Sequence, residues 1–280
     1  NAQTPGGNFT LSFSDLASRG TVDANFPIRA SPPPRFPIEG EVVLDASHDF
    51  RIRDGKFLTA AEVKQIIDQA VAQANKTRAA IRRPIGTPAR IFVTVVDVDG
   101  TVLGIWRTPD ATLFSYDVSA QKARTALAFS DPANPLGQLI RRILGLAPDQ
   151  PLAMTCRAVG FLSQRFFPPG IDSETLGHPL EPGPLYIDVG NKFDFEFQRQ
   201  LGLKPFGNGI TIFPGGVPLY KNGQLVGGVG VSGDGVDQDD IITFAGSVGF
   251  EPPPEIRCDQ FFYKGVRLPY VKFPRRPEID

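Results

Sequence analysis

The chain has 280 residues, of which 41% are hydrophobic, and its formal net charge is -1. This length can bury a substantial core in one large domain or two small ones, and the near-neutral charge gives no electrostatic reason to expect a nucleic-acid partner. The sequence has no run of 18 apolar residues, so we expect no membrane span.

The N-terminal region, residues 1–55, has few periodic signals and a proline cluster at 32–34, which predicts an extended arm. The chain begins at Asn1 with small polar residues and no Met. This fits a mature end left by signal-peptide removal as well as it fits a trimmed chain. We favour export, and therefore a periplasmic or extracellular location.

The next segment contains four regular elements with clear local signals. A capping box formed by Thr59 and Glu62 precedes apolar residues at helical spacing. Two β-branched runs follow, joined by the turn sequence DVDG, and an alanine-rich stretch then precedes Asp131-Pro132. These signals predict a helix, two strands of a hairpin and a second helix, at about 60–78, 91–96, 101–106 and 116–129.

Residues 135–210 differ in kind, with a short amphipathic helix around 139–144 and several Phe-Pro clusters, so we interpret them as an insertion into the domain. The chain after the triple proline at 252–254 has no helical period. We therefore expect a domain over 56–250, interrupted by that insertion, and an extended C-terminal tail over 251–280.

Residues 215–232 predict a second hairpin, because Asn222-Gly223 can supply the two positive φ angles of a type I′ turn. Its second strand matches the G-x-G-x-x-G spacing of dinucleotide-binding loops. We reject that function because the strand belongs to an antiparallel hairpin and four aspartates follow between 234 and 240. We interpret the glycines as sites of close backbone approach, and the aspartates as caps of a helix near 239–248 rather than metal ligands.

The two cysteines, Cys156 and Cys258, leave two alternatives open. In an oxidising compartment they could close one long loop as a disulfide, and otherwise they are buried free thiols. The sequence has no C-x-x-C pair and no H-E-x-x-H, so the familiar zinc signatures are absent.

Four segments in this order resemble the GlcG/HbpS-like haem-binding family, which also forms the C-terminal half of PduO-type proteins. The segments are LTAAEVKQIIDQA, FVTVVDVDGTVLGIWR, SYDVSAQKARTALAF and GGVPLYKNGQLVGGVGVSGDGVDQDD. The resemblance covers residues 56–134 and 211–248 and implies an α/β (α+β) fold, a profilin-like antiparallel sheet with packed helices. It also implies a homo-oligomer that binds haem or a small ligand.

Site residues follow from this resemblance and from the few haem-ligating side chains in the chain. His48 is a candidate axial ligand, with an exposed loop histidine as the alternative. Lys122 and Arg124 are candidate partners of a propionate or another carboxylate, with a solvated helix face as the alternative. The remaining candidates line the expected pocket or act there as acid and base: Tyr116, Thr125, Gly215, Gly216, Pro218 and Asp237.

Three functions therefore compete. The first is an exported haem (tetrapyrrole) or small-ligand-binding protein. The second is a small-molecule lyase, isomerase or hydrolase with Asp237, Lys122 and Tyr116 as acid and base candidates. The third is a self-assembling structural subunit that uses its two arms. No Ser-His-Asp or Cys-His arrangement is recognisable to favour the enzyme.

Overall fold

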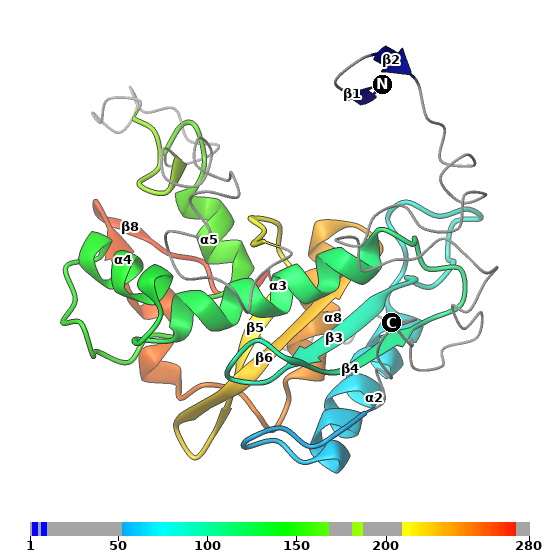
Figure 1. Cartoon of the computed structure of the whole chain (residues 1–280), viewed down its shortest axis with the longest axis horizontal. Coiled ribbons are helices and arrows are strands. Elements are labelled where there is room, and N and C mark those ends of the chain that lie inside the picture. The colour runs from blue at the N-terminus through cyan, green and yellow to red at the C-terminus, as the bar shows by residue number, and fades with distance from the viewer. Residues whose placement is uncertain (1, 5–6, 10–51, 168–180, 187–208, 273–280) are drawn as a thin grey trace.

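The computed structural model describes residues 2–4, 7–9, 52–167, 181–186 and 209–272. Its centre is a four-stranded antiparallel sheet in the order β4-β3-β6-β5 (Figure 1). The predicted combination of helices with an antiparallel sheet is confirmed, while the finer likeness to profilin stays a prediction. The strands are β3 (Phe92–Val96), β4 (Val102–Arg107), β5 (Gly216–Lys221) and β6 (Gln224–Ser232).

Both predicted hairpins are present, and their turns have the expected backbone angles. Asn222 and Gly223 have φ of 51° and 78°, as a type I′ turn requires. In the β3–β4 turn, Asp97 accepts from the Val98 N–H and Asp99 accepts from the Thr101 N–H. These two aspartates are therefore turn formers. The hairpins join through the β3–β6 pair, which sets Phe92 opposite Ser232.

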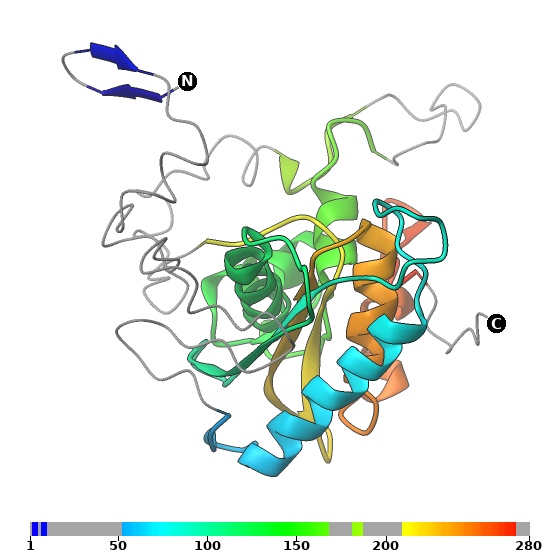
Figure 2. The ribbon, with the colours of Figure 1, turned by 90° about the vertical axis from the view of Figure 1, so that its right-hand side faces the viewer.

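Helices cover both faces of the sheet, as the side view in Figure 2 shows. One face carries α2 (Ala60–Lys76) and α8 (Val236–Gly246), and the other carries α3 (Ser115–Ser130). The Thr59–Glu62 capping box is formed. The apolar face of α2 is buried as its periodicity predicts, with Val63, Ile66, Ile67, Ala70 and Ala74 inside.

The glycines of β6 let α3 lie directly on the sheet. A Cβ atom at Gly230 would lie 2.1 Å from the Ser119 carbonyl oxygen, and one at Gly228 would lie 2.5 Å from the Ala123 carbonyl oxygen. Both carbonyls belong to α3, so any side chain here would push the helix away. The glycine spacing in this strand therefore serves helix packing.

The described parts of the expected insertion and tail lie against the same core. The short helices α4 (Pro135–Ile143) and α5 (Cys156–Leu162) bury Leu136, Ile140 and Val159. Helix α4 begins at Pro135, before the predicted start near residue 139, because Asn134 caps its N-terminus. The C-terminal segment forms η2 (Pro254–Ile256), η3 (Cys258–Gln260), β7 (Phe262–Tyr263) and β8 (Val266–Arg267).

After β8 the chain returns to the core, where Leu268, Tyr270 and Val271 are buried. In the region expected as an N-terminal arm, β1 (Ala2–Thr4) pairs antiparallel with β2 (Gly7–Phe9). Across the described residues, no helix combines the length and the apolar character that a membrane crossing needs.

Candidate functional site

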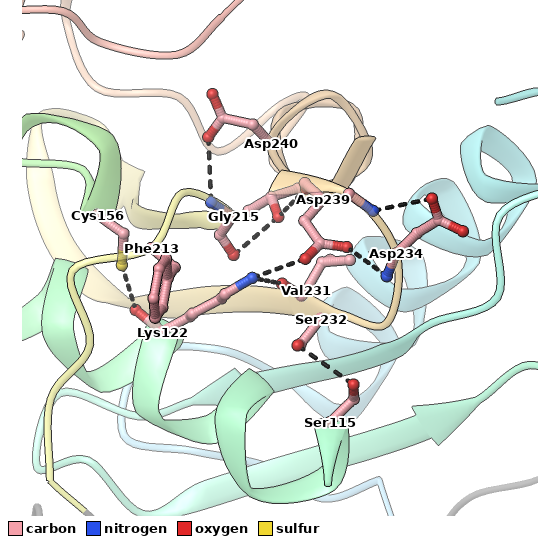
Figure 3. Close-up of polar contacts among 12 residues, drawn as sticks. Ser115, Lys122, Cys156, Phe213, Gly215, Val231, Ser232, Asp234, Asp239 and Asp240 are labelled. Atoms are coloured by element: carbon pink, nitrogen blue, oxygen red, sulfur yellow. Dashed lines mark hydrogen bonds and ion pairs between the residues drawn. The ribbon is translucent and has the colours of Figure 1, made fainter. Parts of the chain in front are cut away.

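Lys122 of α3 lies beside Gly215 at the end of the sheet where β6 ends and β5 begins (Figure 3). Residues 213–215, which precede β5, are called the Gly215 turn below. The Lys122 Nζ donates to Asp239 Oδ2 and to the Val231 carbonyl oxygen, each at 2.8 Å. Lys122 and Asp239 are both 2% exposed. Asp239 comes from α8, on the opposite face of the sheet, and its Oδ1 accepts from the Asp234 N–H at 3.2 Å.

The Gly215 turn leaves room for this ion pair because residue 215 is a glycine and has no side chain. Gly215 has φ of 110°, and a Cβ atom there would lie 3.0 Å from Lys122 Nζ. Its N–H donates to Asp240 and its carbonyl oxygen accepts from the Thr243 hydroxyl. At Gly216 a Cβ atom would lie 2.4 Å from the Lys122 carbonyl oxygen. The structure thus brings Lys122, Gly215 and Gly216 together, and it places Pro218 further along, buried in β5.

The surroundings of Asp239 set its protonation. Burial raises the pKa of Asp239 to about 6, and the neighbouring Lys122 ammonium opposes that rise. The carboxyl group is therefore ionised at neutral pH and holds Lys122 as a paired ammonium. A lysine in this position has no free charge to offer a ligand.

Asp237 takes part in a second ionic group on the outer side of α8. Arg157 donates to Asp237 and to Asp240, each at 2.6 Å. The Lys272 ammonium lies 3.0 Å from Asp237, and the Lys272 N–H donates to Asp240 at 2.6 Å. Although partial burial opposes it, hydrogen bonds from Lys272 and Arg157 lower the pKa of Asp237. The observed contacts of Asp237 thus fasten α5 and the C-terminal segment to α8.

The other predicted residues of α3 make contacts of several kinds. The Tyr116 ring is buried and packs edge-on against Phe92, with centroids 6.0 Å apart. Arg124 Nε donates to the Gly100 carbonyl oxygen in the β3–β4 turn at 2.9 Å, and burial lowers the pKa of this guanidinium. Thr125 accepts from the Thr211 N–H at 2.9 Å. The contacts of Asp237 and Lys122 thus belong to two separate ionic groups.

Most side chains able to ligate haem iron are buried in the described part of the chain, where only Tyr186 and Tyr263 among them are partly exposed. His48 lies outside the described residues. Met154, Cys156 and Cys258 have no exposed surface. Both cysteines are free, and burial raises the pKa of each thiol to about 12. The disulfide alternative is therefore not formed, and these thiols are protonated hydrogen-bond donors to the Lys122 and Pro269 carbonyl oxygens.

Two features of this end of the sheet were not predicted from the sequence. One is Asp239 as the partner of Lys122; the adjacent residues Asp239 and Asp240 are both buried, and no local signal distinguishes Asp239 as that partner. The other is a pair of exposed aromatic rings. Phe114 at the start of α3 is 61% exposed, and Phe213 of the Gly215 turn is 56% exposed.

Comparison with known proteins adds independent information. The curated relatives include the corrinoid adenosyltransferase PduO of Salmonella typhimurium and that of Citrobacter freundii, each 26% identical over 163 residues. The matched region is 58% of this chain but 33% of each relative, so the chain spans about a third of their length.

Solved structures with a similar chain course include a PduOC:haem complex and a double mutant of Streptomyces reticuli HbpS. The first has a TM-score of 0.41 and 21% identity, over 69% of this chain and 95% of that one. The second has a TM-score of 0.38 and 20% identity, over 71% of this chain and 90% of that one.

The family model described as "Haem degrading protein HbpS-like" matches residues 58–247, which is more than half of the chain. The match includes all four segments on which the resemblance was based, from the start of α2 to the end of α8. The resemblance to the GlcG/HbpS-like family is thereby confirmed, and the protein belongs to the HbpS-like family.

Proposed function

We propose that this protein binds haem or a related tetrapyrrole at the end of the sheet that carries Phe114 and Phe213. The exposure of these two aromatic rings is the observation that carries the proposal. Phe114 precedes Ser115, whose hydroxyl contacts Ser232 at the end of β6, and Phe213 precedes β5, so both belong to the same end of the sheet. Contiguous exposed apolar surface marks ligand or partner sites. The family description and the haem complex of a PduOC relative support the choice of ligand.

Phe114 and Phe213 offer apolar surface to a tetrapyrrole, and among the described side chains able to ligate iron only Tyr186 and Tyr263 are partly exposed. Lys122 is occupied by Asp239, so it is unsuited to pair with a propionate. The described Met and Cys side chains are buried. We propose His48, which lies outside the described residues, as the axial ligand.

Haemin titration followed in the Soret region tests this function. Phe114→Ala and Phe213→Ala should each weaken binding about fivefold, since each removes stacking worth about 1 kcal/mol. Phe262→Ala is the matched control because Phe262 is 58% exposed but belongs to β7 in the C-terminal segment. His48→Ala should shift the Soret maximum if His48 ligates iron. No Soret change with the unaltered chain, or equal losses in all three Phe variants, would contradict the proposal.

We also propose that the protein acts outside the cytoplasm and assembles as a homo-oligomer. The location is supported by the family resemblance, and the assembly by the exposed apolar side chains at this end of the domain. Cell fractionation tests the location. Light scattering tests the assembly, and deletion of residues 1–40 should lower the mass if the N-terminal region contributes to it.

A further inference from the structure

A cavity of about 500 Å³ lies at the other end of the sheet. Its lining includes Val98 of the β3–β4 turn and Gly223–Leu225 of the β5–β6 hairpin. Strand β6 runs from Gln224 at this cavity to Ser232 at the Lys122 end, and at about 3.3 Å per residue the two ends are roughly 25 Å apart. A ligand in this cavity would therefore not touch the proposed tetrapyrrole site.

The wall formed by the α3–α4 and α4–α5 connections is held in place by Arg141. This side chain is 1% exposed, lines the cavity, and donates to the carbonyl oxygens of Gln150, Gly137 and Ser130 at 2.8 to 2.9 Å. These hydrogen-bond partners are neutral backbone groups, and the Asp131 carboxylate, which also lines the cavity, lies close enough to interact with the charge of this guanidinium. Such bonding to backbone groups makes the wall preformed.

The remaining charged residues of the lining have opposite signs. Lys56 and Asp149 are exposed, and Asp131 is partly exposed. Within the described part of the chain, no ion pair joins Lys56 to either aspartate. The Lys56 ammonium lies instead 5.1 Å from the Phe57 ring centre. The lining also includes the apolar side chains of Phe57, Leu152 and Leu225.

We propose that this cavity is a second ligand site, for a small zwitterion with an apolar side chain, that is, a free amino acid or a close analogue. Its carboxylate faces Lys56 and the positive charge of Arg141, and its ammonium group faces Asp131 and Asp149. Its side chain contacts Phe57, Leu152 and Leu225. The volume lies within the range of small-molecule pockets. This site is independent of the proposed haem function.

Calorimetric titration of the full chain with L-phenylalanine and L-leucine tests the proposal. Lys56→Met and Asp149→Asn should each weaken binding at least about fivefold, the loss expected from one charge contact of about 1 kcal/mol. The N-acetyl amide of each amino acid, which lacks both charges, should not bind. Lys64→Met and Asp68→Asn are matched controls, because this exposed pair on α2 does not line the cavity.

Three results would overturn the proposal: no heat up to about 10 mM ligand, equal binding of the neutral amides, or unchanged affinity in both cavity variants. All four substituted residues are exposed, so misfolding would not explain a loss of ligand binding. A haemin titration of Asp149→Asn should match that of the unaltered chain, so failure of this site and failure of the tetrapyrrole site are distinguishable.

Discussion

Lys122 and Asp239 join helices that lie on opposite faces of the sheet, with Nζ and Oδ2 2.8 Å apart. The contact is possible because it occurs beside Gly215, where no side chain fills the space at the start of β5. Buried ion pairs of this kind add little net stability, but breaking one leaves an uncompensated charge inside the protein. Their role is to fix how the elements are placed relative to one another.

The Lys122→Met variant tests the importance of this pair. We expect it to lower the free energy of unfolding by about 3–5 kcal/mol at pH 7.5, because it leaves the Asp239 carboxylate buried without its cation. Urea denaturation measures the loss. The control is Lys64→Met, which breaks the exposed Lys64–Asp68 pair on α2 and should cost less than about 0.5 kcal/mol. Equal losses in the two variants would show that burial of the pair is unimportant.

The penalty of Lys122→Met should depend on pH. Burial raises the pKa of Asp239 to about 6 in the folded protein, above the value of about 3.9 expected when unfolded. In the native chain this group's contribution to stability therefore falls between about pH 4 and pH 6 and is constant above that. Without Lys122 the folded pKa rises further, so the variant keeps losing stability above pH 6, by up to about 1.4 kcal/mol per pH unit.

Urea denaturation of both proteins from pH 6 to pH 8 measures this widening difference. The expected sign is a penalty that grows with pH. A penalty that stays constant or shrinks over this range contradicts the assignment of Asp239 as the group left without its cation.

A further prediction concerns the fastening of the C-terminal segment to α8. Arg157→Met removes the cation that contacts the fully buried Asp240, and should cost about 3 kcal/mol. The Lys272 amide, which donates to Asp240, should then exchange with solvent faster than in the native chain. Hydrogen exchange with mass spectrometry measures this. Arg142→Met, at an exposed position of α4, is the control and should leave the exchange of residues 268–272 unchanged.

Gly230→Ala should destabilise the protein by about 3 kcal/mol, because its Cβ would meet the Ser119 carbonyl oxygen of α3. The control is Gly145→Ala, where φ is 69° and no heavy atom lies within 4 Å of the added Cβ. Its cost, about 1 kcal/mol, reports backbone strain alone. Urea denaturation compares them, and a Gly230→Ala loss no larger than that of the control would argue against direct helix contact.

Local signals explain which parts of the fold could be predicted. The Asn222-Gly223 turn and the Thr59–Glu62 box act within a few residues, and both are present as expected. The contact between Lys122 and Asp239 spans 117 residues and has no local signal of its own. From the sequence, the aspartates near the start of α8 all resemble helix caps. Only the packing of α8 on the sheet turns Asp239 inward.

The C-terminal segment illustrates the same limit. Its prolines and its lack of periodicity indicated irregular backbone, and the structure there consists of 3-10 turns and two-residue strands. Whether such a segment stays apart or packs is decided by distant partners. Here Thr155 donates to the Tyr270 carbonyl oxygen and Asp240 accepts from the Lys272 N–H. Neither contact can be inferred from residues 251–280 alone.

The two edges of the sheet limit how copies of this protein can associate. Along β5, Pro218 has no N–H to donate, and the Tyr220 N–H already donates to the Phe250 carbonyl oxygen. Along β4, Arg53 covers part of the edge. Its N–H donates to the Leu103 carbonyl oxygen, and its guanidinium donates to the Val102 carbonyl oxygen. Among the described residues, these contacts therefore reduce the number of edge groups that a neighbouring molecule could pair with. Assembly of this fold should proceed through side-chain surfaces rather than by continuing the sheet from one subunit into the next.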